Sequence, residues 1–523
     1  MNVSFLQQSL NIDNKIGLLD QSFEENIGIL EKRPLSSPNG TRSEFDRHLH
    51  SDVPKWVKYI FRSPIAFVHT LLSRPFLMRL AWFLVPSFLQ GRHALPKPAK
   101  LSPTAYLDGM RGLAALFVFF CHYTYTSFDV GFAWGGNNSN YDILKVPILR
   151  LWYQGPVSVT IFFLISGYAL SYRPLKLIRS QDNHELLNTL SSSVFRRLLR
   201  LYIPTAIATA LVVCFVRLGV YEYTREFSQD RTYIKFVVES HPVRFDSSWD
   251  QWGDYYWTML RMIHVFGWDR PFAHNFYHVH LWTIPIEYRC SLYLFLVILA
   301  TARLRMIWRY VTLCLVILLS YRHSKWELVM FLFGMGLAEW DLHRGAHVPV
   351  PAGAKRNPFK KLHTIFWNCV SVIGLFLMSF PDAGADTTPG YVYLSTWIPW
   401  WWNSEPYRPW QSVGCLIFAL AVSNSDFWKG FYNSGFIQYL GKISYALYLV
   451  HGPVLHMVGY HWEKWAWSVT GVEGGQYGCG FVLSMFLSVP TVFWVADLFW
   501  RAVDIPTVKF ARWFENQLVV KSK

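Results

Sequence analysis

The chain has 523 residues, of which 52% are hydrophobic, 18% aromatic and only 16% charged. Soluble proteins carry about 25% charged residues, so this composition excludes an ordinary soluble protein and predicts that most of the chain lies in a lipid bilayer. The formal net charge of +15 would suit nucleic-acid binding, but no motif or soluble basic domain of that kind is present. We therefore attribute the charge to cytoplasmic loops and expect no nucleic-acid partner.

The N-terminal hundred residues differ from the rest of the chain. Up to about Asp52 they are polar, charged and interrupted by prolines, which predicts a disordered cytosolic tail without a signal peptide. Between Trp56 and Leu89, basic residues break the apolar runs too often for a comfortable span. This stretch predicts interfacial amphipathic helices, and one further membrane hairpin is the alternative. We group residues 1–100 as this cytosolic tail and interfacial region.

Ten apolar runs follow, with lengths near those that a bilayer requires. They are Ala105–Tyr125, Gly155–Tyr172, Leu201–Val220, His280–Ala300, Met306–Ser320, Trp326–Trp340, Leu362–Phe380, Ser412–Asn424, Phe436–Tyr460 and Gly478–Trp500. The fifth, sixth and eighth are short for a full span. The pattern predicts an all-α integral membrane protein, a bundle of about ten transmembrane helices with a buried polar site. We place this domain at residues 101–505 and a cytosolic C-terminal tail at 506–523.

Lysine and arginine favour the cytoplasmic side of a membrane, and this rule predicts the orientation. With the N-terminus cytosolic, the basic residues gather on the cytosolic side: Arg173, Lys176, Arg179, Arg196, Arg197, Arg200, Arg303, Arg305, Lys355, Arg356, Lys360, Lys361, Lys509, Arg512, Lys521 and Lys523. Only the short loop with Arg322 and Lys325 disagrees. An even number of spans puts both termini in the cytosol, and we expect the endoplasmic reticulum or another endomembrane.

Three further patterns bear on modification and metals. In this topology the sequon at Asn137 faces away from the cytosol, so Asn137 is the predicted glycosylation site. The seven cysteines show no CxxC spacing and predict neither a disulfide framework nor a metal site. The histidines from His264 to His280 are irregularly spaced and match no metal motif, so we interpret them as a lumenal loop at the entrance to a site.

A polar stripe interrupts the first apolar run. A helix turns 100° per residue, so Arg111 and His122 lie about 20° apart on one face and roughly 16 Å apart along the axis. Asp108 falls on the same face. Three ionisable groups are costly in lipid unless partner helices or a hydrated cavity surround them, so the stripe indicates a buried functional site.

Five motifs occur in order along the chain. They are LDGMRGLAALFVFFCH with ten residues between Arg and His, GPVSVTIFFLISGYAL, VFRRLLRLYIP, HLWTIPIEYRCSLY and IQYLGKISYALYLVHGPVL. Together, over roughly Thr104 to Trp500, they resemble the membrane acyltransferase-3 family. The long cytosolic tail favours a fungal member. The resemblance implies O-acylation, in which an acyl group, usually acetyl from acetyl-CoA, passes to a hydroxyl of a small metabolite, lipid or glycan. Acyl-CoA is then a co-substrate, and no permanently bound cofactor is expected.

Residue roles follow from the resemblance together with the chemistry. Hydroxyls are poor nucleophiles at neutral pH, and histidine is the side chain best suited to deprotonate them, so His122 is the predicted general base. Arg111, about three turns away, is expected to hold a CoA phosphate or the acyl carbonyl, or to serve a structural role. Glu287 is expected to orient a catalytic histidine or contact the acceptor hydroxyl; the alternative is a structural pair with Arg289 or another buried cation.

Two further sets of residues have both a functional and a structural interpretation. The cluster of Arg196, Arg197 and Arg200 fits a clamp for CoA phosphates, and it fits the positive-inside rule equally well. His451, Ser444 and Tyr448 are predicted to line the acceptor site, while helix packing is the alternative for the two hydroxyl residues.

The principal rival function is a multi-pass transporter in which buried Arg, His and Glu form a proton relay. The chain shows no internal repeat and no paired broken helices, which transporters commonly have. A scaffold that has lost activity is a third class, although the motif residues are retained. Direct transfer and a transient acyl-enzyme both stay open. Among acceptors a small metabolite is favoured, because no carbohydrate-handling domain is attached.

Overall fold

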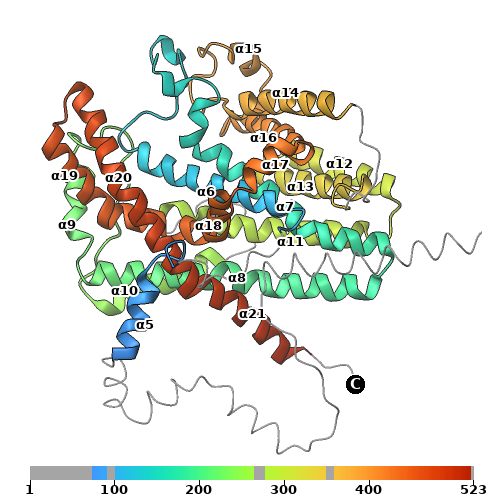
Figure 1. Ribbon diagram of the computed structural model, residues 1–523, viewed down its shortest axis with the longest axis horizontal. Helices are drawn as coiled ribbons and strands as arrows, with labels where there is room; N and C mark the ends of the chain where they lie inside the picture. Colours follow the sequence, from blue (N-terminus) through green and yellow to red (C-terminus); the bar gives the residue numbers. More distant parts are fainter. Residues whose placement is uncertain (1–73, 91–100, 264–276, 349–358, 520–523) are drawn as a thin grey trace, which may run out of the picture. The chain divides into compact units, whose positions relative to one another are not determined.

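The computed structural model describes residues 74–90, 101–263, 277–348 and 359–519, and within them every regular element is helical (Figure 1). The chain divides into two compact units, Met1–Pro103 and Thr104–Lys523. In the first unit the structure describes helix α5, Arg74–Leu84, which exposes Met78 and Trp82. Exposed apolar side chains suit the interfacial helix predicted for this stretch. The predicted tail and the first part of the interfacial region lie outside the described residues.

The second unit is a helical bundle. Its helices are α6 (Ala105–Thr124), α7 (Gly155–Ser180), α8 (Asn183–Arg217), α9 (Glu222–Arg225), α10 (Ser248–Ile263), α11 (Thr283–Thr301), α12 (Met306–Arg322), α13 (Trp326–His343), α14 (Lys360–Met378), α15 (Val392–Ser395), α16 (Arg408–Asn424), α17 (Asp426–Tyr432), α18 (Gly435–Val454), α19 (Tyr460–Thr470), α20 (Gly474–Phe499) and α21 (Ile505–Leu518). Two π-helical turns, η8 (Leu455–Gly459) and η9 (Trp500–Asp504), join α18 to α19 and α20 to α21.

Five helical segments of the described chain are long and apolar enough to cross a membrane. They are Gly155–Ser180, Asn183–Arg217, Val279–Thr301, Lys361–Met378 and Gly474–Leu518. The other predicted spans also coincide with helices, but these helices are shorter or less apolar. The all-helical membrane fold is therefore confirmed, whereas the count of about ten spans stays a prediction.

Helix α8 begins well before the span that the sequence predicts from Leu201. It starts at Asn183, where the side chain of Asp182 accepts a hydrogen bond from the Glu185 backbone N–H and caps the helix. Arginine and leucine are good helix formers, so the basic motif continues the helix into the span instead of forming a loop. The arginines of this motif thus sit on a rigid element.

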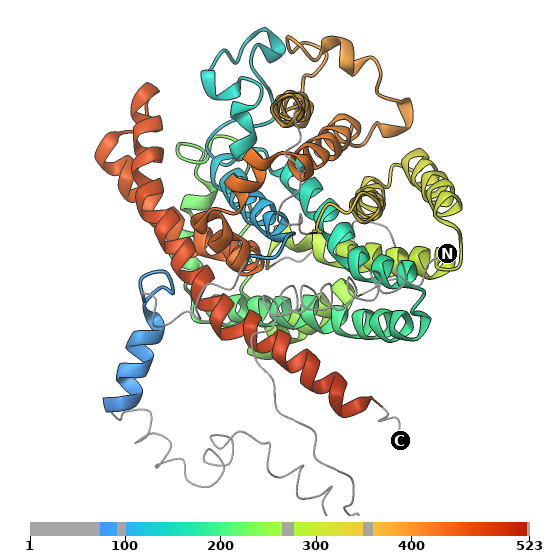
Figure 2. The same cartoon turned by 45° about the vertical axis from the view of Figure 1, so that its right-hand side comes forward.

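Glycines allow two central helix pairs to approach closely. Helix α7 packs on α13, where a Cβ on Gly167 would lie 2.1 Å from the Phe331 carbonyl oxygen. Helix α6 packs on α18, beside it in Figures 1 and 2, and there a Cβ on Gly112 would lie 2.3 Å from the Gly441 backbone nitrogen. Small residues at such crossings increase van der Waals contact between membrane helices. The glycines of the SGY and LG motifs are therefore packing residues.

Alanine at Gly334 is expected to destabilise the bundle, whereas alanine at Gly336 on the same helix is not. A Cβ on Gly334 would lie 2.2 Å from the Leu164 carbonyl oxygen, but one on Gly336 would meet only the end of the Leu313 side chain at 3.3 Å. Forcing apart a packed helix pair costs roughly 1–3 kcal/mol. Thermal unfolding of the two detergent-solubilised variants measures the difference, and equal midpoints would contradict the packing role of Gly334.

Candidate active site

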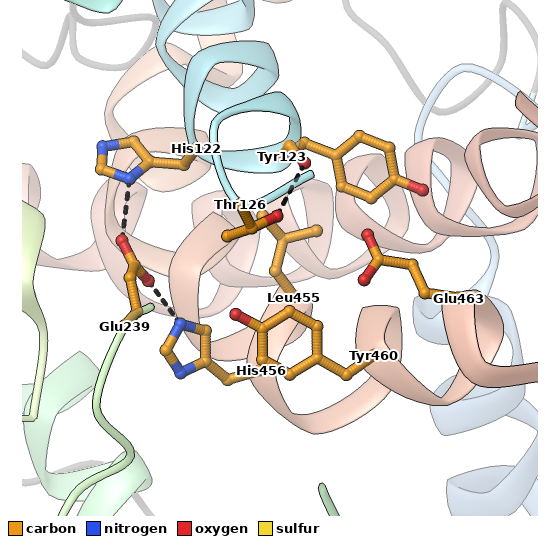
Figure 3. A pocket seen from close by; sticks show the side chains of 8 residues that line it. All are labelled: His122, Tyr123, Thr126, Glu239, Leu455, His456, Tyr460 and Glu463. Atoms are coloured by element: carbon orange, nitrogen blue, oxygen red, sulfur yellow. Dashed lines mark hydrogen bonds and ion pairs between the residues drawn. The ribbon is translucent and has the colours of Figure 1, made fainter. Parts of the chain in front are cut away.

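His122 occupies the last turn of α6 and faces a carboxylate that the sequence motifs do not contain. Its Nδ1 lies 3.1 Å from Glu239 Oε1 (Figure 3). The same nitrogen lies 3.1 Å from the Tyr125 hydroxyl oxygen. Glu239 belongs to the segment between α9 and α10, and the two side chains are 21% and 10% exposed. A buried carboxylate on one ring nitrogen fixes the tautomer of a neutral imidazole. His122 thus has the geometry of an oriented base.

The second oxygen of Glu239 is held by another histidine. Glu239 Oε2 lies 2.5 Å from His456 Nε2, so the carboxylate bridges two imidazole rings (Figure 3). The His456 ring stacks on His241 with centroids 4.9 Å apart. Thr224 donates a hydrogen bond to the His456 carbonyl at 2.8 Å and lies 3.0 Å from His241 Nε2. The position of His456 is therefore fixed from two sides.

Two carboxyls of the same small pocket differ in ionisation. Burial alone raises the pKa of Glu239, but the hydrogen bonds from His122 and His456 outweigh burial and hold that pKa below its usual range. Glu463 lines the same pocket, and burial raises its pKa to about 8. Burial also lowers the pKa of His241 to about 3. Near neutral pH the site therefore contains an ionised Glu239, a protonated Glu463 and a neutral His241.

A group of buried histidines lies on the other side of His122. The His122 ring centroid is 5.2 Å from that of His451 and 5.6 Å from that of His280, and these two are 4.3 Å apart. His451 Nδ1 is 3.0 Å from the Leu447 carbonyl oxygen, so Nδ1 carries the proton and Nε2 has a lone pair. Nε2 of His451 and of His280 has no hydrogen-bond partner within the described residues. A hydroxyl entering here would find the Nε2 lone pair of His451 beside His122. Where the chain is described, no group of three or more metal-ligating side chains is arranged for a metal ion.

The residues predicted for the acceptor site are divided between two places. Tyr448 lies with the histidines, because its hydroxyl is 2.6 Å from Thr283 Oγ1 and donates to the His280 carbonyl. Ser444 instead accepts a hydrogen bond from Arg111 Nε at 3.0 Å. Ser444 is therefore part of the contact between α6 and α18, and its place in the acceptor site stays a prediction.

Arg111 and Glu287 both lie away from His122. Arg111 pairs with Asp108 at 3.1 Å and donates to the Gly441 carbonyl at 3.1 Å, which joins α6 to α18. Glu287 accepts from Arg197 at 2.6 Å and from Ser166 at 2.9 Å. Glu287 is therefore paired with a cation. The carboxylate that contacts His122 is Glu239, although the sequence led us to expect Glu287 beside a catalytic histidine.

The three arginines of α8 have different surroundings. Arg196 pairs with Glu515 of α21 at 3.2 Å, and Arg197 pairs with Glu287. Arg200 makes no salt bridge to any described residue, although the charges of Asp504 and Arg111 act on it. Arg200 is exposed and is the least neutralised of the three.

Asn137 lies away from the histidines. It is exposed in the connection between α6 and α7, and its backbone N–H donates to Thr387 Oγ1 at 2.9 Å. The side chain is therefore accessible to solvent, and its glycosylation stays a prediction.

Comparisons with known proteins agree with this architecture. The model of an acyltransferase domain family, acyltransferase-3, matches residues 104–500. The chain is 30% identical over 461 residues to the O-acetyltransferase PaAT-1 of Phomopsis amygdali, covering 83% of this chain and 88% of that protein. It is 26% identical over 458 residues to the acyltransferase R4 of a Phoma species, covering 79% and 96%. No solved structure gives a significant match.

The family match spans the helices that carry all five motifs and the histidine group. The predicted resemblance is confirmed, and the similar proteins are fungal. The helices long enough to cross a bilayer place the chain in a membrane. The chain therefore belongs to the acyltransferase-3 family and is a membrane enzyme that transfers acyl groups other than aminoacyl groups.

Proposed function

We propose that the enzyme transfers an acyl group, acetyl in the first instance, from acyl-CoA to a hydroxyl of a small metabolite, with His122 as general base. The observation that carries this proposal is the ionised Glu239 carboxylate on Nδ1 of His122. The similarity to a protein named an O-acetyltransferase supports acetyl as the group and oxygen as the acceptor atom. Lipids and glycans are the other acceptor classes that the same chemistry serves.

The proposed step is a direct transfer. Because Glu239 accepts the Nδ1 proton, Nε2 of His122 is free to accept a proton. Nε2 takes the proton of the acceptor hydroxyl as its oxygen forms a bond to the thioester carbonyl carbon. The carbon–sulfur bond then breaks, and the imidazolium returns the proton to the CoA thiolate. The lone pair on His451 Nε2 is placed to accept a hydrogen bond from a neighbouring hydroxyl of the substrate.

The proposal places the donor at the opposite end of α6. Arg200, with Arg111 near it, offers the least neutralised positive charge there for the anionic phosphates of CoA. In the same proposal the enzyme lies in the endoplasmic reticulum or another endomembrane with both termini cytosolic. The Arg200 end then faces cytosolic acyl-CoA.

Removing the Arg200 side chain is expected to weaken donor binding. The Arg200→Ala variant should raise the KM for acetyl-CoA about tenfold, the change that loss of one charge-assisted contact produces, while kcat stays within about twofold. Arg305→Ala is the matched control, because Arg305 is also exposed but belongs to the connection between α11 and α12. Equal KM values for the two variants would contradict donor binding by Arg200. Its charge would then serve only to set the orientation of the chain in the membrane.

Transfer of labelled acetyl from acetyl-CoA tests the proposed function. Membranes that contain the chain, and membranes that lack it, are incubated with pooled hydroxylated metabolites and, separately, with glycans. A labelled ester that depends on the chain and appears only with the metabolites supports the proposal and identifies the acceptor. Labelling of the glycans alone would overturn the proposed acceptor class.

A further inference from the structure

Glu239 is a carboxylate of the site that no sequence motif contains. Its two carboxylate oxygens contact histidines from two separate elements, α6 and η8. A carboxylate that is 10% exposed is costly to keep ionised unless both oxygens are satisfied, and here both are. Figure 3 shows Glu239 between the two rings.

We infer that Glu239 is a positioning residue for the base His122, and that His456 acts through Glu239 by holding its second oxygen. The inference rests on the proposed role of His122. Glu239 accepts the Nδ1 proton of His122 and so presents Nε2 to the substrate. When Nε2 takes the hydroxyl proton, the carboxylate stabilises the imidazolium that forms.

His451 and His456 serve different sides of the site. Five residues separate them, which in an α-helix corresponds to about 140° around the axis. His451 contacts the His122 ring, while His456 contacts Glu239. His456 belongs to the π-helical turn η8, which begins two residues after Pro453, and π-turns are frequent at functional sites.

The other groups near the base do not take the place of Glu239. Among the described residues, Tyr125, His280 and His451 are the further titratable side chains that contact the His122 ring, and none of them is an anion at neutral pH. Glu463 lines the pocket but is held protonated by burial. Glu239 is thus the carboxylate placed to stabilise positive charge on His122.

The decisive variant is Glu239→Gln. We expect kcat to fall about 100-fold or more, as for loss of an oriented base, with the KM for acetyl-CoA within about twofold. The acid limb of the kcat/KM profile should move to lower pH, because the imidazolium loses its carboxylate partner. Glu239→Asp keeps the charge and should recover at least about a tenth of wild-type kcat. Glu222→Gln, which alters an exposed carboxylate paired with Arg225, is the matched control.

A double-mutant cycle tests whether His456 acts through Glu239. His456→Phe alone should lower kcat about tenfold, and His456→Gln, which keeps a donor nitrogen, should lower it less. Adding His456→Phe to Glu239→Gln should have no further effect. Independent, multiplying losses would overturn the role of His456.

The outcomes also separate this inference from the proposed function. A Glu239→Gln enzyme with wild-type kcat and pH profile, alongside an inactive His122→Ala enzyme, would overturn the inference and leave His122 as base. Persistent transfer by His122→Ala would instead remove the proposed function. If Glu239→Gln does not fold, the kcat values of His456→Phe and His456→Gln test the inference. Equal kcat values for these two variants would contradict it.

Discussion

Acyl transfer by the His122→Ala variant is expected to be about 10²- to 10⁴-fold slower than transfer by the wild type, the range that a general base contributes. The loss should appear in kcat, because the arginines proposed to bind the donor, Arg111 of α6 and Arg200 of α8, do not contact His122. Folding should be retained, since the His122 side chain is 21% exposed and sits at the end of the helix. The measurement is labelled acetyl transfer at saturating acetyl-CoA with equal amounts of membrane protein.

A second histidine provides the control for this result. His363 is exposed on α14 and contacts Trp367 of the same helix, so His363→Ala should transfer at the wild-type rate. Equal rates for a well-folded His122→Ala and the wild type would contradict the assignment of the base. A loss of thermal stability in His122→Ala would show that the histidine group is also required for packing.

Alanine at Glu287 is expected to reduce the free energy of unfolding by roughly 3 kcal/mol, because it leaves the partly buried Arg197 without its partner. The pair is short, at 2.6 Å, its side chains are 16% and 21% exposed, and it joins α8 to α11. Ser166 of α7 donates to the same carboxylate, so three helices meet at Glu287. Thermal unfolding in detergent gives the size of the effect.

The double variant Arg197→Met, Glu287→Leu separates a structural pair from a catalytic carboxylate. Replacing both partners by apolar residues removes the unpaired charge and should recover most of the lost stability. If Glu287 is structural, acyl transfer returns with stability. A stable double variant that stays inactive would instead support the chemical role that the sequence analysis considered for Glu287.

The sequence by itself determined the class of fold and of enzyme. Its apolar runs predict a helical membrane protein, because backbone N–H groups inside lipid can form hydrogen bonds only with backbone carbonyls of the chain. The Arg-to-His stripe on α6 was also predictable, since the angle between two residues of one helix depends only on their spacing. The five motifs predicted the family, and the match to the family model confirms it. None of these conclusions requires contacts between distant elements.

Only the tertiary structure decided the partners of these residues. Glu239 lies in a segment without motif or periodicity, and it meets His122 across 117 residues. His456 directly follows the last motif, but its spacing along the helix does not indicate that its ring meets the carboxylate of Glu239. The sequence predicted Ser444 for the acceptor site and Glu287 for a histidine or the acceptor hydroxyl, with helix packing or an ion pair as the alternative, and only the packing of α6 and α8 shows their arginine partners. Spacing along one helix sets which face a side chain occupies, whereas the identity of the group opposite depends on how separate helices pack.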